Sequence, residues 1–207
     1  MNTEIFYHGS SVLFDKFDLS HALEGDGKVK FGYGVYVTQE YATAAHYAFN
    51  DKRPENETYY VYTVEIPSLT PENHLFQKQP VPESILHRTE EKLGETIPED
   101  VLKSGDSKDF RKYIGNRILQ KEGKEGYQKK TLRQLIGSAT PESEKAAAVF
   151  FESIGLACYV WPRAWSKPEI TNRAILDDTK VKILKIEKVE LDEKKHQLIP
   201  GSQKQIK

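Results

Sequence analysis

The sequence predicts an α+β fold, a mostly antiparallel, split β-sandwich with peripheral helices. Stretches rich in β-branched and aromatic residues lie in both halves of the chain, and one short alanine-rich helix interrupts those of the first half. A polar, lysine-rich helical block separates them from the last strands. This order favours an α+β domain over a doubly wound parallel sheet. With 207 residues, the chain is long enough to bury a hydrophobic core.

The first third of the chain contains three predicted strands, at residues 3–8, 35–38 and 58–66. The third is rich in tyrosine and valine and stops at Pro67, which has no N–H to donate to a strand ladder. Alanines at positions 42, 45 and 48 recur at helical spacing and predict a short helix with Thr38 as its N-cap. Residues 10–30 are expected to form a loop.

Several short helices are expected between residues 82 and 137, because this stretch is polar, lysine-rich and interrupted by glycines. A longer helix follows, with Thr140 as N-cap, Pro141 as first residue and Gly155 at its end. The last strands are predicted at residues 156–161, 170–176 and 181–189.

These elements predict a single domain over residues 1–190. Residues 77–137 form a helical, lysine-rich insertion within it. Residues 191–207 are polar and contain Pro200 and Gly201, so we expect a frayed C-terminal tail.

Composition excludes several classes of protein. Hydrophobic residues make up 38% of the chain and charged residues 29%, values typical of a globular protein and unlike those of a low-complexity chain. The 30 basic and 31 acidic residues give a net charge of -1, so the overall basic excess of a dedicated nucleic-acid-binding protein is missing. No signal peptide or apolar run of about 20 residues is visible, which favours a cytoplasmic location without a membrane partner. Secretion by a route that needs no cleaved signal stays open.

The usual sequence signatures of metal and cofactor chemistry are also missing. The single cysteine, Cys158, lies in an apolar stretch and is expected to be a buried thiol. No two histidines stand three or four residues apart, so we expect no metal site. The Gly32-Tyr33-Gly34 segment lacks the third glycine of a dinucleotide-binding turn, and no Gly-x-Ser-x-Gly elbow predicts a hydrolase.

Two segments near the amino terminus combine residues that suit ligand binding. His8, Gly9 and Ser10 end the first strand, and residues 31–38 (Phe-Gly-Tyr-Gly-Val-Tyr-Val-Thr) lead into the helix that carries Tyr47. Glycines before a strand let a ligand approach the backbone, and tyrosines eleven residues apart can converge where a strand meets its following helix. Taken alone, His8 can equally be a structural histidine and Tyr47 a core aromatic.

Together these segments resemble the NAD-dependent ADP-ribosyltransferases of the diphtheria-toxin and poly(ADP-ribose)-polymerase superfamily. The resemblance is closest to the ADP-ribosyltransferase domains of phage-associated polyvalent proteins. That pattern runs from His-Gly-Ser through Phe-Gly-x-Gly-(Ile/Val)-Tyr to Ala-x-Tyr, and it matches residues 8–10, 31–36 and 45–47. It extends through residues 60–67 and 171–178, so that about residues 4–76 and 138–186 are covered. An ADP-ribosyltransferase-like split sandwich is the fold that it implies.

The resemblance implies NAD+ as a substrate, no metal, and a role for each motif residue. His8 would hydrogen-bond the adenosine-side ribose, the backbone of Gly9 would grip the nicotinamide carboxamide, and Ser10 would lie beside the ribose. Tyr36 and Tyr47 would hold the nicotinamide ring between them.

Two further positions belong to the same NAD-binding set. Gly34, just before the second strand, would let the dinucleotide approach the backbone. Ala44 stands where many relatives have a serine that bonds the carboxamide. One contact to nicotinamide would therefore be missing here.

The third motif departs from the family. Relatives with a His-Tyr-Glu set place a glutamate carboxylate on the nicotinamide-ribose hydroxyl, whereas Asn172 stands at the matching position here. The expected catalytic set is therefore His8, Tyr36 and Asn172, and Glu169 could serve only in a different register. A neutral acceptor makes a hydrogen bond about half as strong as a charged one. Because the glutamate activates the growing chain in polymerising relatives, mono-ADP-ribosylation is favoured.

We expect the acceptor to be a macromolecule, either nucleic acid or protein. From Lys103 to Arg133, ten basic residues accompany four acidic ones, a balance of +6 that leaves -7 for the rest of the chain. Phe110, Tyr113 and Tyr127 interleave with these charges, which suits phosphate contacts and base stacking and slightly favours RNA or DNA. Solvated helices with inward-facing aromatics are the alternative interpretation.

The resemblance further implies a bacterial or phage-related toxin or defence effector with an antitoxin or immunity partner. Two other functions stay open. The first is a degenerate module that binds NAD or a partner without catalysis, with which Asn172 is compatible. The second is simple hydrolysis of NAD, as in a glycohydrolase.

Overall fold

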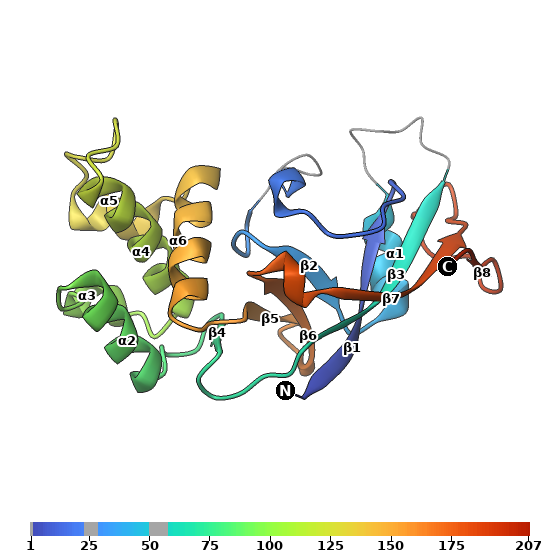
Figure 1. Ribbon diagram of the computed structural model, residues 1–207, viewed down its shortest axis with the longest axis horizontal. Helices are drawn as coiled ribbons and strands as arrows, with labels where there is room; N and C mark the ends of the chain where they lie inside the picture. The colour runs from blue at the N-terminus through green and yellow to red at the C-terminus, as the bar shows by residue number, and fades with distance from the viewer. Residues whose placement is uncertain (1, 23–28, 50–57) are drawn as a thin grey trace. The chain divides into compact units, whose positions relative to one another are not determined.

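The computed structural model of the protein describes residues 2–22, 29–49 and 58–207. Within these ranges the chain is α+β, with six helices and one mixed, mostly antiparallel sheet of eight strands in the order β4-β5-β6-β2-β1-β3-β7-β8. The strands are β1 Thr3–Ser10, β2 Val35–Thr38, β3 Tyr59–Pro67, β4 His74–Phe76, β5 Cys158–Ala164, β6 Lys167–Ile175, β7 Lys182–Val189 and β8 Lys204–Gln205. The helices are α1 Tyr41–Ala48, α2 Glu83–Leu93, α3 Glu99–Leu102, α4 Ser107–Lys121, α5 Leu132–Gly137 and α6 Pro141–Ser153 (Figure 1). Residues 23–28 of the predicted loop lie outside the described residues.

The chain divides into two compact units. We call the first the strand unit; it comprises Met1–Gly27, Val35–Ser68 and Pro162–Lys207. The second, the helical unit, comprises Lys28–Gly34 and Leu69–Trp161 and contains α2 to α6. The predicted insertion of residues 77–137 falls inside the helical unit, which takes in α6 as well.

The central strand of the strand unit is β1, and its two edges differ. Figure 1 shows it beside β3, with which it pairs along its whole length, from Thr3 opposite Pro67 to Ser10 opposite Tyr60. On the other edge, Tyr7 opposite Thr38 is the one described pair between β1 and β2. Beyond that pair the two strands separate. The neighbouring β2 continues the sheet by pairing with β6.

The helix α1 packs on one face of this sheet through small residues. Ala44 and Ala45 share a buried cluster with Val61 and Val189, from β3 and β7. The contact requires glycine at position 9, because a Cβ there would lie 1.8 Å from the carbonyl oxygen of Ala44. The backbone of α1 therefore rests directly on the end of β1.

Two expectations about the strand unit are wrong. Thr38 is the last residue of β2, where it pairs with Asn172, and Glu40 is the N-cap of α1. The C-terminal tail is not frayed, because β8 pairs with β7 and Leu191 bridges Leu198. Both leucines pack against the cluster beneath α1, and this apolar burial outweighs the polar composition of the tail.

In the helical unit, α4 and α6 approach closely at a glycine. A Cβ on Gly115 would lie 2.0 Å from the carbonyl oxygen of Ser143. The start of α6 is as predicted: the Thr140 side chain accepts the N–H of Ser143 in a capping box, and Pro141 is the first residue. Gly155, with φ of 89°, follows its C-terminal end.

The three aromatic residues of the basic segment face inward. Phe110, Tyr113 and Tyr127 are 0%, 3% and 6% exposed, and the Tyr127 hydroxyl lies 2.7 Å from the Thr140 hydroxyl. Stacking on a base needs an exposed ring face, so the expectation that these rings stack on nucleic acid is wrong. The alternative interpretation, helices with inward-facing aromatics, is confirmed for them.

A buried ion pair connects α4 with α6. The Nε and Nη2 atoms of Arg111 donate to the two carboxylate oxygens of Glu144 at 2.8 and 3.1 Å, and the side chains are 5% and 1% exposed. The Arg111 guanidinium also lies over the Tyr159 ring, 5.0 Å from its centroid. Two charges tolerate this burial because each compensates the other.

We expect Glu144→Ala to lower the free energy of unfolding by about 3–5 kcal/mol, because Arg111 would keep its buried charge and lose its carboxylate. Urea denaturation followed by circular dichroism measures the change. Glu142→Ala is the matched control, because Glu142 stands two residues away in α6 and its loss breaks only an exposed pair with Lys124, so the midpoint should shift little. Equal midpoints for the two variants would contradict a stabilising role for the buried pair.

Candidate functional site

The candidate site lies in the strand unit, where β1 and β2 separate. The Nδ1 atom of His8 lies 2.7 Å from the carbonyl oxygen of Tyr36. Because a carbonyl only accepts, Nδ1 carries the proton and donates it, which leaves Nε2 as a hydrogen-bond acceptor in the neutral ring. Desolvation by burial lowers the pKa of His8, with the hydrogen bond to Tyr36 opposing it, so the ring is neutral at pH 7.

Aromatic side chains surround the imidazole. The ring centroids of Phe17, Tyr62 and Phe14 lie 5.0, 6.0 and 6.1 Å from that of His8. The Tyr62 hydroxyl accepts the N–H of Phe14 and donates to the carbonyl of Val12, which holds the chain after β1 over the ring. Burial raises the pKa of Tyr62 to about 12. His8 therefore has a structural role at this position, whatever else it does.

Tyr36 and Asn172 share one face of the sheet. Tyr36 pairs with Ala174, and Thr38 pairs with Asn172. Side chains of residues paired across two strands point to the same side of a sheet, and so do those of alternate residues along one strand. Tyr7, opposite Thr38, packs against the α1 cluster, so α1 covers this same face. Strand alternation places the His8 side chain on the opposite face, from which it reaches the Tyr36 carbonyl between the strands.

Asn172 carries a buried acceptor without a donor. The residue is 7% exposed, and its Oδ1 meets no hydrogen-bond partner among the described residues. Leaving such a group unpaired costs about 1–3 kcal/mol, so a fold keeps one mainly where something else supplies the donor. Among the predicted NAD-binding and catalytic residues, Asn172 is the one with such an atom.

The other predicted NAD-binding residues are placed as follows. Gly9 and Ala44 meet in the packing of α1 on β1, where Ala44 is buried. The Ser10 hydroxyl accepts the N–H of Val12 at 3.0 Å. Gly34 immediately precedes β2. Tyr47 lies on α1 and is 68% exposed, so its interpretation as a core aromatic is wrong.

Glycine at position 32 is required for packing within the helical unit. It has φ of 103°, and a Cβ would lie 2.3 Å from the Tyr159 ring. The space beside its α-carbon is therefore filled by an aromatic side chain. The expectation that a ligand approaches the backbone closely at a glycine before the second strand is therefore not supported at Gly32.

A polar cluster that no sequence motif marks lies at the end of the β2·β6 ladder. The side-chain oxygen of Gln39 accepts the N–H and the hydroxyl of Thr171. Next along the chain, the Glu40 carboxylate binds the Arg163 guanidinium through two contacts, Nε to Oε2 at 2.7 Å and Nη1 to Oε1 at 3.0 Å. Thr43 donates its hydroxyl to the same Oε2 at 2.7 Å. The one signal for this cluster in the sequence is the polar pair Gln39-Glu40, which stands between the predicted strand at residues 35–38 and the start of the alanine-rich helix.

Glu169, the alternative to Asn172, does not share the sheet face of Asn172 and Tyr36 in the regular geometry of β6. It is exposed and stands three positions before Asn172. An odd separation along a strand points two side chains to opposite faces. Of these two β6 residues, Asn172 is therefore the one whose side chain shares a face with Tyr36.

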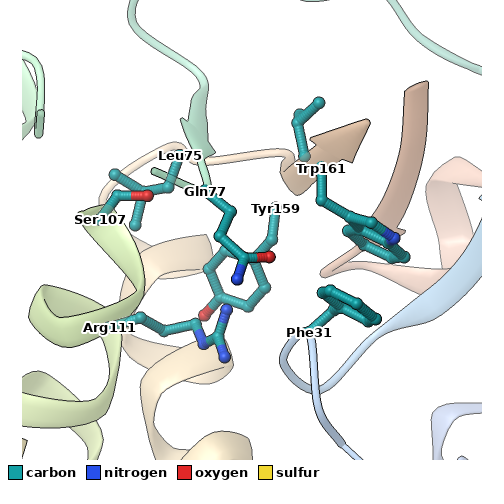
Figure 2. A pocket seen from close by; sticks show the side chains of 8 residues that line it. Phe31, Leu75, Gln77, Ser107, Arg111, Tyr159 and Trp161 are labelled. Carbon is teal, nitrogen blue, oxygen red and sulfur yellow. The ribbon is translucent and has the colours of Figure 1, made fainter. Parts of the chain in front are cut away.

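A hollow lies within the helical unit and is shown in Figure 2. Phe31 and Trp161 stack there with ring centroids 4.4 Å apart and planes 4° apart, beside Arg111 and Tyr159. A water-sized sphere finds about 10 Å³ of space there, far less than the roughly 300–1,000 Å³ of typical small-molecule sites. A dinucleotide does not fit this space.

Metal and membrane chemistry find no support within the described ranges. Over residues 2–22, 29–49 and 58–207, no three histidine, cysteine, aspartate or glutamate side chains gather as a metal site. Cys158 is buried, as predicted. None of the helices in the part of the chain that the structure describes has the length and apolar character needed to cross a bilayer.

A comparison with protein-family models, curated proteins and solved structures finds no match to this chain. Any functional assignment therefore depends on the motif residues and their geometry.

We expect the stability of the protein to fall as the pH drops below about 6.5, because the unfolded state binds the His8 proton more readily than the folded state. Above that pH the contribution of His8 is constant. His8→Gln should reduce this slope, measured as the free energy of unfolding in urea at pH about 5 and about 7.5. His87→Gln, which changes an exposed histidine on α2, should keep it. A slope unchanged by His8→Gln would contradict a buried, neutral imidazole.

Proposed function

We propose that the protein is an NAD-dependent mono-ADP-ribosyltransferase, which transfers ADP-ribose to a macromolecular acceptor and releases nicotinamide. The observation that carries this proposal is the unpartnered, buried Oδ1 of Asn172 on the face that Tyr36 shares. A ribose hydroxyl is a donor of the kind that this atom lacks. The proposal includes the assignment of this sheet to the ADP-ribosyltransferase-like split sandwich.

The separation of β1 from β2 supports a bound ligand that contacts both faces of the sheet. His8 lies toward one face and Asn172 on the other, and the strands have no described pair beyond Tyr7 and Thr38. A dinucleotide with one ribose at Nε2 of His8 and the other at Asn172 would have to reach both faces of the sheet where the two strands diverge. The exposed ring of Tyr47, on the helix that covers the Asn172 face, offers an aromatic surface for the nicotinamide.

The reaction requires no covalent bond between the substrate and the protein. The bond between C1′ of the ribose and the pyridinium nitrogen breaks, its electron pair neutralises nicotinamide, and positive charge develops on the ribose. A lone pair of the acceptor then forms the new bond at C1′, and the acceptor's proton passes to solvent. Catalysis of this kind depends on orientation and on groups placed to stabilise the developing charge.

The acceptor remains either nucleic acid or protein. The aromatic residues of the segment 103–133 are buried, and several of its cations bond within the helical unit, as Arg117 does with Glu95 and Lys124 with Glu142. The sequence-based preference for RNA or DNA thus loses part of its support. Action as a cytoplasmic toxin or defence effector with an antitoxin is proposed from the motif resemblance alone.

A second candidate function is an NAD-binding module without catalysis. Asn172 favours it, because a neutral amide stabilises positive charge less than a carboxylate does. NAD cleavage without transfer, as in a glycohydrolase, is the intermediate case. The three functions differ in whether nicotinamide is released and whether a polymer becomes labelled.

We expect NAD labelled in its adenylate half to transfer label to a polymer in cell lysate, with release of nicotinamide. Samples treated with nuclease or with protease identify the acceptor class. Tyr47→Ala should abolish both signals, because it removes the exposed aromatic surface of α1, and its urea midpoint should match that of the wild type. Nicotinamide release without label indicates hydrolysis. Intact NAD with measurable NAD binding indicates the non-catalytic module.

A further inference from the structure

The Glu40 carboxylate lies at the end of the ladder that holds Asn172. Thr38 pairs with Asn172, and Gln39 exchanges hydrogen bonds with Thr171, so Glu40 follows directly along the same edge. Two residues of extended chain span about 7 Å, which sets the scale of the separation between Glu40 and the Thr38 position.

The ion pair of Glu40 reaches across the strand that carries Asn172. In the sheet, β6 lies between β5 and β2, and Arg163 belongs to β5 whereas Glu40 follows β2. The two side chains therefore meet over β6. Thr43, in the first turn of α1, also bonds the carboxylate, which places it on the side of the sheet that α1 covers. This is the face that Tyr36 and Asn172 share.

Three hydrogen bonds hold the carboxylate in one orientation. Two come from the fork of the Arg163 guanidinium and one from the Thr43 hydroxyl. The Glu40 side chain stays 28% exposed, so it is accessible to a ligand. Solvent-exposed ion pairs contribute little to stability, so folding alone gives weak reason for this arrangement. A carboxylate oriented before the substrate arrives is what stabilisation of a developing cation requires.

We propose that Glu40 supplies the negative charge that the third motif lacks, with Arg163 as its positioning residue. This inference rests on the proposed NAD-cleaving function. Asn172 orients the ribose through its free Oδ1, and Glu40 stabilises the positive charge that develops at C1′ as the electron pair leaves with nicotinamide. Glu40 takes up no proton; the proton of the acceptor or of water passes to solvent.

The test measures nicotinamide release from NAD+ by the full-length protein, which requires no knowledge of the acceptor because water also serves. We expect Glu40→Gln to lower kcat about a hundredfold, with the KM for NAD+ within about threefold of the wild type and the urea midpoint unchanged. Glu40→Asp should recover part of the loss. Arg163→Lys, which keeps the charge and loses the fork, should lower kcat less than Glu40→Gln.

Glu65→Gln is the matched control, because Glu65 is a similarly exposed, paired carboxylate of the strand unit, on β3. It should keep the wild-type kcat. A wild-type kcat in Glu40→Gln, or a large loss in Glu169→Gln, overturns the inference. In that case a loss in Tyr47→Ala would leave the proposed function standing. Absence of both nicotinamide release and NAD+ binding in the wild type would overturn the inference and the proposed function together.

Discussion

The hydrogen bond from His8 to the carbonyl of Tyr36 is the interaction on which the candidate site depends. A sheet whose central strand separates from its neighbour leaves backbone groups without ladder partners, and such groups are costly when buried. The imidazole supplies the missing donor at 2.7 Å. Burial keeps the ring neutral by lowering its pKa, and Phe14, Phe17 and Tyr62 provide that burial. The divergence of β1 and β2 is thus stabilised by the histidine to which we assign ligand binding in the proposed function.

The motif residues have structural roles as well as proposed functional ones. Gly9 admits the backbone of α1, and Gly32 admits the ring of Tyr159, so neither glycine leaves open space beside its α-carbon. Asn172 differs from them, because its buried Oδ1 lacks a donor. Among the motif positions, this residue has the feature that internal packing explains least.

The basic segment shows how a charge count depends on where a segment is cut. The balance of +6 between Lys103 and Arg133 omits acids that lie just outside it. Arg111 pairs with Glu144, and both Arg117 and Lys121 bond Glu95. Much of the apparent excess is therefore met by neighbours in the helical unit, and the near-neutral charge of the whole chain describes this region better than the local count did.

The sequence by itself determined the elements that local rules control. The strand before Pro67, the Thr140 capping box and the burial of Cys158 all follow from patterns within a few residues. Tertiary structure alone decided the pairing of the polar tail, the burial of Asn172 and the contact of Glu40 with Arg163, 123 positions apart. Such contacts arise from strand order and register, and neither periodicity nor composition records which distant strands become neighbours.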